Sequence, residues 1–348
     1  MGPLTHIQHV LATGWWVAAA FCLVLYVVLD GADLGAGIFS LFIPDPDERG
    51  AIMQAMAGTW DANETWLVVA GGVLFGSFPF IYGSVLSYLL IPFVFILWGI
   101  LTRAVALEFR HLAEPRWKPL TDRAFGLSSL VVTFFGGVAV GAVLHGFPLT
   151  DTPNTVPTYV GGAFRFISPF SVWTGIAAVI VVSLAGGLFV RARFEPRERV
   201  RQRAEAWTEI VFYLALGAVP ISVVLMMVTF PWARQTWFGP DIWLWALIPL
   251  AAIGTTFLMR RANRRDRNLA ALLWLDATIV IMAAGLIATL WPAIVPGTWT
   301  IDSGASREIT LLRFYLTLAF LFPVTLMYNW YQIWVFRARV AKLASYHG

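Results

Sequence analysis

An apolar segment that carries two acids decides the class of this protein. Residues 14–42 have the sequence GWWVAAAFCLVLYVVLDGADLGAGIFSLF. An α-helix needs about 20 apolar residues to cross the hydrocarbon core of a bilayer, so this segment is long enough. A charged side chain near the bilayer centre costs roughly 2.5–3.5 kcal/mol on insertion scales, and such residues usually face a protein interior or a water-filled path. The segment therefore predicts a membrane-spanning helix with a functional polar face at Asp30 and Asp33.

The composition extends this prediction to the whole chain. Its 348 residues are 59% hydrophobic and only 13% charged, with a mean hydropathy of +0.73. Soluble proteins carry about 25% charged residues. Apolar runs recur along the sequence without the alternation of a β-barrel, and the single cysteine excludes a disulfide framework. We therefore expect an all-α polytopic membrane protein, with one integral membrane domain over residues 1–348.

Hydropathy predicts nine transmembrane helices. Their expected bounds are 14–42, 53–78, 81–107, 122–146, 167–190, 207–229, 241–259, 270–292 and 309–336. We expect them to form two four-helix bundles plus one helix, packed through small residues.

The basic residues support this count and predict the orientation. Of the 24 Lys and Arg residues, all but Arg165, Arg234, Arg307 and Arg313 fall on one side of a nine-span arrangement. Arg103, at the end of the third span, is counted with the majority. Because cytoplasmic loops carry an excess of Lys and Arg, the N-terminus is predicted to be periplasmic and the C-terminus cytoplasmic. The net charge of +4 is thus explained by topology, and no nucleic-acid partner is expected.

Two acids in the second predicted span match those in the first. Asp61 and Glu64 lie in the segment TWDANETW at 59–66, three residues apart like Asp30 and Asp33. Residues three apart project from one helix face. Because the two helices are antiparallel and joined by a short loop, the four carboxylates should lie at similar depth. The sequence therefore predicts one cluster of four acids between the cytoplasmic surface and the midplane.

Three interpretations of this cluster are open. Carboxylates crowded in a low dielectric cannot all ionise, which favours a proton-conducting or proton-storing cluster loaded from the cytoplasm. Alternatively, the acids cap or pair with buried groups, such as an arginine of a partner, and move no protons. The third interpretation is a site for an oxygen-liganded cation such as Mg²⁺ or Ca²⁺.

Small and aromatic residues surround the acids. Gly31 and Gly35 form a small-xxx-small pair that Gly37 extends, which lets a neighbouring helix approach closely. We expect this glycine face, together with the acids of the second span, to lie near a partner protein. The second span adds an amide and two flanking indoles, from Asn63, Trp60 and Trp66.

Ligands for a redox centre are missing from the spans. A haem held within the membrane needs axial ligands such as buried His or Met. The sequence also has no dinucleotide-binding, phosphate-loop or CxxC motif. We therefore expect no metal site and no cofactor bound by the chain's own ligands. The five histidines lie in tails or loops, or at the outer end of the fourth span: His6, His9, His111, His145 and His347.

The eighth predicted span contains one acid. Asp276 lies close to its cytoplasmic start, and five arginines occur between 260 and 267. Pairing with these arginines, or extension of the carboxylate to the membrane surface, is the expected explanation for this residue.

Three motifs resemble subunit II of the cytochrome bd-type quinol oxidases, most closely the cyanide-insensitive type. They are DGADLGAG at 30–37, WDANETWLVVAGGVLFGSFP at 60–79 and LEFRH at 107–111. Together they cover about the first third of the chain. The occurrence of DGxDxGxG and WDxNExW in consecutive spans is far more specific than either motif alone.

The resemblance implies a haem-free subunit of an electrogenic terminal quinol:O2 oxidoreductase in the bacterial inner membrane. In that family, subunit II forms a heterodimer with subunit I, which holds the b-type and d-type haems. Subunit I oxidises quinol and reduces O2 to water with protons from the cytoplasm. A small single-span subunit is common, and some members bind a structural quinone within subunit II.

The resemblance also implies roles for individual residues. Asp61 matches an acid on a proton route that crosses the subunit interface, and Asp33 belongs to the same polar region. Trp66 matches a tryptophan beside an apolar path proposed for O2. We therefore expect a proton pathway through Asp61, Glu64, Asp33 and Asp30, supported by Trp60, Asn63 and Trp66.

Two other functions remain as alternatives. One is a proton- or sodium-coupled secondary transporter, which would use the acids to drive solute uptake. Such transporters usually have broken helices in corresponding halves, and no such pair is evident from the sequence. The other is a purely structural assembly subunit, in which the acids could be neutralised without loss of turnover.

Overall fold

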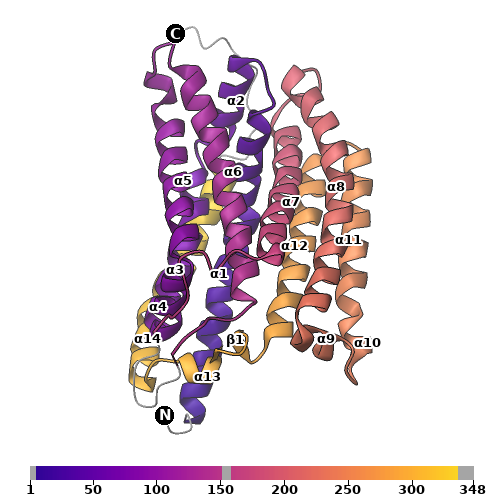
Figure 1. Ribbon diagram of the computed structural model, residues 1–348. Coiled ribbons are helices and arrows are strands. Elements are labelled where there is room, and N and C mark those ends of the chain that lie inside the picture. The colour runs from indigo at the N-terminus through magenta and orange to yellow at the C-terminus, as the bar shows by residue number, and fades with distance from the viewer. Residues whose placement is uncertain (1–4, 151–157, 336–348) are drawn as a thin grey trace.

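The structure is a computed structural model that describes residues 5–150 and 158–335, and it consists almost entirely of helices that stand side by side (Figure 1). The longer helices are α1 (His6–Ser40), α3 (Trp60–Ser77), α5 (Leu90–Phe109), α6 (Lys118–Val143), α7 (Pro169–Arg193), α8 (Arg199–Thr229), α11 (Leu247–Arg264), α12 (Asn268–Leu290) and α14 (Glu308–Val335). The shorter elements are α2 (Pro46–Met56), α4 (Pro79–Tyr88), a 3-10 turn η1 (Arg110–Leu112), α9 (Pro231–Trp237), α10 (Ile242–Trp245), α13 (Ile301–Gly304) and the antiparallel strands β1 (Ala293–Val295) and β2 (Trp299–Thr300).

The all-α polytopic membrane fold is confirmed. Within the described residues, eight helical segments are long and apolar enough to cross a membrane. They correspond to every predicted span except the second. The second span falls on α3, whose first turns carry the polar residues of the WDANETW motif. The total of nine spans and the orientation of the termini remain predictions.

Three predicted spans are wrong as continuous helices. Span 53–78 is interrupted between α2 and α3 at residues 57–59, which include Gly58, a poor helix former. Proline explains the other two breaks, because its ring clashes with the carbonyl four residues earlier. Four residues before Pro92 is Tyr88, where α4 ends, and four residues before Pro249 is Trp245, where α10 ends.

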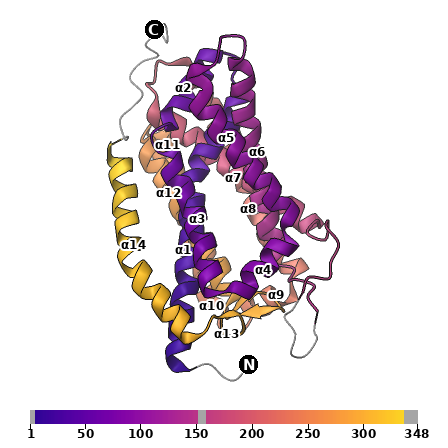
Figure 2. The same ribbon diagram turned by 90° about the vertical axis from the view of Figure 1, so that its left-hand side faces the viewer.

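The helices pack in two groups. The first group runs from α3 through α1 and α6 to α5, and the second runs from α8 through α7 and α12 to α11. Contacts of both α1 and α6 with α7 join the groups, and Figure 1 shows the groups side by side. The last helix, α14, packs on α1 and α3 along one outer edge (Figure 2). This packing agrees with the expected two four-helix groups and a peripheral helix.

The glycine face of α1 is buried inside the chain. A Cβ atom on Gly35 would lie 1.9 Å from the carbonyl oxygen of Val182 in α7, and one on Gly37 would lie 2.2 Å from a serine oxygen of α6. In the same way, a Cβ atom on Gly186 of α7 would lie 1.9 Å from the carbonyl carbon of Gly35, so the two helix backbones are in direct contact. A Cβ on Gly31 would make only an ordinary contact at 3.8 Å. This face is therefore occupied by α6 and α7 of the same chain, and the expectation that it lies near a partner protein stays a prediction.

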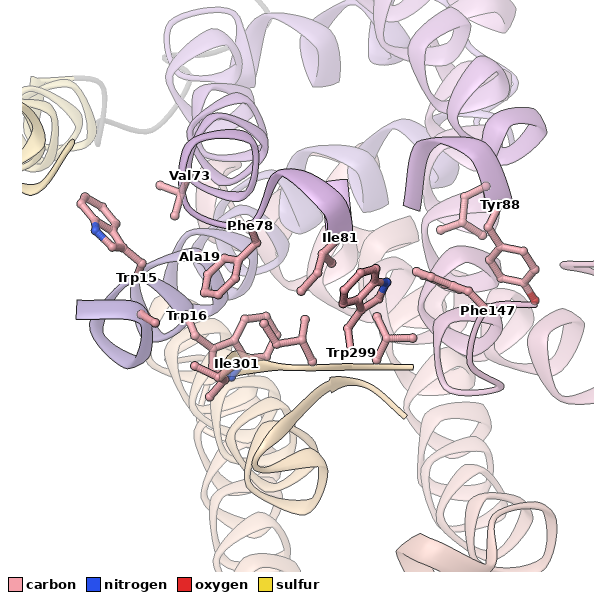
Figure 3. Close-up of a cluster of buried hydrophobic side chains, with 14 of the residues drawn as sticks. Trp15, Trp16, Ala19, Val73, Phe78, Ile81, Tyr88, Phe147, Trp299 and Ile301 are labelled. Carbon is pink, nitrogen blue, oxygen red and sulfur yellow. The ribbon is translucent and has the colours of Figure 1, made fainter. Parts of the chain in front are cut away.

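An aromatic cluster lies at the end of the fold where α1 begins. It joins the first turns of α1 to α4 and to the β1–β2 connection. Figure 3 shows Trp299 between Ile81 and Phe147, with Trp16 close to Ile301. Tryptophan and tyrosine are typical of membrane–water interfaces, where they anchor helix ends. The opposite end of α1 is covered by α2 (Figure 1).

Candidate functional site

Asp30 and Arg103 form a fully buried ion pair between α1 and α5. Arg103 Nη1 donates to Asp30 Oδ2 at 2.8 Å, and Nη2 donates to Oδ1 at 2.5 Å. Neither side chain has any exposed area. Two parallel charge-assisted hydrogen bonds are among the strongest polar contacts in proteins. Asp30 therefore has an internal counter-ion, which neutralises it within the membrane region.

Sequence reasoning missed the contribution of Arg103 to this site. Arg103 was assigned to the cytoplasmic charges that set topology, and this is wrong because the guanidinium lies in the protein interior. The sequence did indicate a buried position, because Arg103 falls inside the predicted span 81–107 rather than beyond its end. A buried acid on one span and a buried base on another indicate a pair.

Two more predicted residues from α3 meet the acids of α1. Glu64 Oε1 lies 3.1 Å from Arg103 Nη1, so Glu64 shares the guanidinium with Asp30. Asn63 Nδ2 donates to Asp33 Oδ2 at 2.9 Å, and Asp33 is 1% exposed. Helices α1, α3 and α5 thus bring together three of the four predicted carboxylates. We call Asp30, Asp33, Asn63, Glu64 and Arg103 the acid cluster.

Asp61 does not join the acid cluster, so the prediction of four clustered acids is wrong. Its side chain is exposed, and no ion pair links it to the described residues. The break before Trp60 explains this position, because Asp61 falls in the first turn of α3 rather than inside a longer helix. A carboxylate in the first turn is stabilised by the helix dipole and needs no buried partner.

The acid cluster has more negative charge and more polar atoms than its own bonds satisfy. Two of its carboxylates, Asp30 and Glu64, share one guanidinium at ion-pair distance, and the third, Asp33, accepts a hydrogen bond from Asn63. Within the described residues, Arg103 Nε, Asn63 Oδ1 and Glu64 Oε1 are buried and have no hydrogen-bond partner. Buried polar groups normally bond to protein or to ordered water, so these atoms suit water molecules as partners. No group of three or more His, Cys, Asp or Glu residues in the described chain is arranged to hold a metal ion.

The two flanking tryptophans have different surroundings. Trp66 is completely buried and packs edge-on against Phe21 of α1 and Phe322 of α14, with ring centroids 6.4 and 5.8 Å apart. Trp60 is half-buried, and its Nε1 donates to Glu108 Oε1 at 3.2 Å. Trp66 therefore lies in an apolar pocket beside the acid cluster, whereas Trp60 lies at the rim.

Helix α2 covers the end of α1 that is nearest to the acid cluster. Arg193 Nη2 of α7 donates to the carbonyl of Ala55 at 2.7 Å, and Arg110 Nη2 donates to the carbonyl of Pro46 at 2.8 Å. Glu48 lies 3.4 Å from Arg203 of α8. Both ends of α2 are therefore fixed by arginines from the surrounding helices.

Asp276 is not paired as expected. Its Oδ1 is buried without a hydrogen-bond partner, and no ion pair joins it to a described arginine. It lies eight residues into α12, which is about 12 Å from the start of that helix. This depth explains why the arginines between 260 and 267 do not pair with Asp276.

Comparison with known proteins identifies the family. Residues 11–336 match the family described as cytochrome bd terminal oxidase subunit II, and the chain belongs to this family. It is accordingly a subunit of a quinol oxidase, an oxidoreductase complex of the respiratory chain that also contains a subunit I. It is a multi-pass protein of the bacterial inner membrane.

Individual relatives cover between 60% and 96% of the chain. The chain is 25% identical over 369 residues to cytochrome bd-I ubiquinol oxidase subunit 2 of Escherichia coli K12, with 96% of each chain covered. It is 28% identical over 212 residues to cytochrome bd ubiquinol oxidase subunit 2 of Bacillus subtilis 168, covering 60% of this chain and 62% of that one. Its fold is similar to a chain of the bd oxidase from Geobacillus thermodenitrificans, with a TM-score of 0.74, 18% identity and coverage of 94% and 99%. The resemblance to subunit II of the cytochrome bd oxidases is thereby confirmed, and the closer likeness to the cyanide-insensitive type stays a prediction.

Proposed function

We propose that this chain is the haem-free subunit of its oxidase and that its acid cluster supplies cytoplasmic protons to subunit I. The haems of subunit I carry out the reduction of O2 to water, and this chain handles protons. The observation that carries the proposal is that Asp30 and Glu64 meet at one guanidinium from α5, while the buried Asp33 is bonded to Asn63 beside Glu64. The transporter alternative has no such support and is set aside by the family.

The charges within the acid cluster assign different roles to its members. Asp30 accepts hydrogen bonds from both Nη atoms of Arg103, which makes it the best-compensated acid of the cluster. One guanidinium cannot neutralise three carboxylates, and its hydrogen bonds go to Asp30 rather than to Asp33 or Glu64. Because unpaired charge is costly in the membrane interior, a proton bound to either group stabilises the cluster. These two residues are the proposed proton carriers, and Asp30 with Arg103 fixes their electrostatic surroundings.

The geometry also supports a direction for transfer. Asp33 is one helical turn closer than Asp30 to the α2 end of α1, which is the predicted cytoplasmic side. The Glu64 side chain keeps 12% of its surface exposed, whereas Asp30 keeps none. We therefore place proton loading at Asp33 and release at Glu64. Asp61, exposed in the first turn of α3, is the proposed link to subunit I.

A structural role for the Asp30–Arg103 pair is the second candidate. It is favoured by the bidentate, fully buried geometry, which satisfies both charges internally. In this version the pair fixes α5 against α1, and no proton passes through the cluster. The two roles predict different results when Asp33 or Glu64 is neutralised. Turnover falls if these residues carry protons and is unchanged if the cluster is structural.

Oxygen consumption by the assembled oxidase tests the proposal. Asp33→Asn and Glu64→Gln keep the size of each side chain and remove its ability to carry a proton. Each should lower the rate at least about tenfold, since proton transfer by a positioned group contributes roughly 10²–10⁴-fold. Glu114→Gln is the matched control, because Glu114 is exposed and pairs with Arg116 away from the cluster. Rates equal to the control, with haem content unchanged in the optical spectrum, would favour the structural role.

A further inference from the structure

A polar cavity opens at the arginine-rich end of the second helix group, far along the chain from the acid cluster. Its volume is about 290 Å³, well above the ~10–15 Å³ that holds one water molecule. Helices α7, α8 and α11 and the turn after α11 contribute its walls. The lining residues are Arg191, Glu205, Glu209, Arg260, Asn263, Arg264 and Asp266.

Arg191 is a buried cation in this cavity with incomplete bonding. The residue is 8% exposed, and its Nη1 donates to Asn263 Oδ1. Its Nε is buried without a hydrogen-bond partner in the described residues. The nearest carboxylate oxygens to Nη2, from Asp266 and Glu205, are 3.6 and 3.9 Å away, beyond hydrogen-bond distance. A guanidinium has five N–H donors, and leaving buried ones unbonded is destabilising.

The acids that line the cavity are bonded to other arginines. Both oxygens of Glu209 accept hydrogen bonds from Arg260, and Asp266 is bonded to Arg201. Glu205, the third acid of the lining, lies 3.4 Å from Arg201 and 3.9 Å from Arg191. All three acids lie at the rim, with side chains about half exposed, at 46%, 49% and 55%. Arg191 is therefore the buried cation among the three arginines and three acids of the lining, and Arg264 adds an exposed guanidinium.

We propose that this cavity binds a phosphate group, with Arg191 and Arg264 as its principal ligands. Guanidinium groups suit phosphate because their planar N–H donors match its oxygens in pairs. An anionic phospholipid headgroup and free phosphate share this chemistry. The lipid is the favoured source, because the adjoining faces of α8 and α11 carry exposed apolar side chains along which acyl chains can lie. Ile210, Leu214 and Phe257 are examples, each more than half exposed.

Lipid binding to the assembled oxidase tests this inference. The complex is purified in a neutral detergent, stripped of lipid, and titrated with dioleoylphosphatidylglycerol under native mass spectrometry. Inorganic phosphate is titrated separately by calorimetry. Arg264→Gln removes an exposed cation, so folding should be retained, and we expect affinity to fall roughly tenfold for one lost charge-assisted contact. Arg261→Gln is the control, since Arg261 is exposed on the same helix but does not line the cavity.

Asn263→Asp provides a second, sharper variant. It places a carboxylate of nearly the same shape against Arg191, which then has an internal anion. Phosphate binding should be lost, while the melting temperature of the complex stays the same or rises. Weakening of phosphatidylglycerol binding by both variants and not by the control supports a lipid site, and the same pattern with inorganic phosphate alone supports a free-phosphate site. Binding that none of the variants changes, or no binding of either probe, would overturn the proposal.

Discussion

Removal of Arg103 is expected to destabilise the oxidase more than removal of its partner Asp30. Breaking a buried ion pair by removing one member costs about 3–5 kcal/mol, because the other charge is left uncompensated. Arg103→Gln leaves Asp30 and Glu64 without their shared guanidinium, so its cost should lie at the upper end. Asp30→Asn leaves Glu64 as a counter-ion, 3.1 Å from Arg103 Nη1, so its cost should lie at the lower end. The double variant should recover much of the loss, because neither unpaired charge of the original pair remains.

Thermal unfolding of the assembled complex measures this difference. A cost of several kcal/mol in a chain of this size corresponds to a fall in melting temperature on the order of 5 °C. The haem spectrum before heating shows whether each variant has assembled. Arg103→Gln and Asp30→Asn should differ in the stated order, and the double variant should melt above Arg103→Gln. Equal melting temperatures for all four proteins would refute the reasoning, since a buried pair cannot then be present.

Three further predictions concern other parts of the fold. Gly35→Ala should prevent normal assembly or lower the melting temperature strongly, because the new Cβ would lie 1.9 Å from a backbone carbonyl oxygen. Gly31→Ala should be tolerated, because the nearest atom to its new Cβ is 3.8 Å away. Burial and the nearby charge of Arg165 lower the pKa of His145, so its contribution to stability is complete above the ordinary value near 6.5 and is lost as the pH falls through the lowered value. Melting temperatures of the complex between pH 7.5 and 5 should therefore decline less in His145→Gln than in the unaltered protein, and parallel declines would contradict this assignment. Asp61→Asn should slow oxygen consumption without loss of haem, and full activity would exclude Asp61 as the link to subunit I.

The sequence predicted the parts of the site that depend on helical periodicity. The three-residue spacing places Asp30 and Asp33 together, and it places Glu64 where an antiparallel neighbour meets them. The small residues of α1 also predicted close packing correctly, because a helix with no side chain at Gly35 can approach its neighbour. What periodicity could not give was the identity of that neighbour, which is α7 of the same chain.

The remaining errors have local physical causes. Arg103 was misassigned because charge counting treats every arginine near the end of a span as a surface charge. A buried acid such as Asp30 can instead keep an arginine inside the protein. Asp61 was placed in the cluster because the break before α3 was not recognised. Breaks at Tyr88 and Trp245 follow directly from proline four residues later, a signal that hydropathy alone does not use.

The central claim is tested most directly by proton uptake during a single turnover. Reduced oxidase in vesicles is mixed with O2, while a pH indicator on the side predicted to be cytoplasmic records protons as they are taken up. The account predicts that Glu64→Gln slows this uptake at least about tenfold, and that Glu114→Gln leaves it unchanged. Uptake at the unaltered rate in Glu64→Gln and Asp33→Asn, with haem content intact, would contradict it.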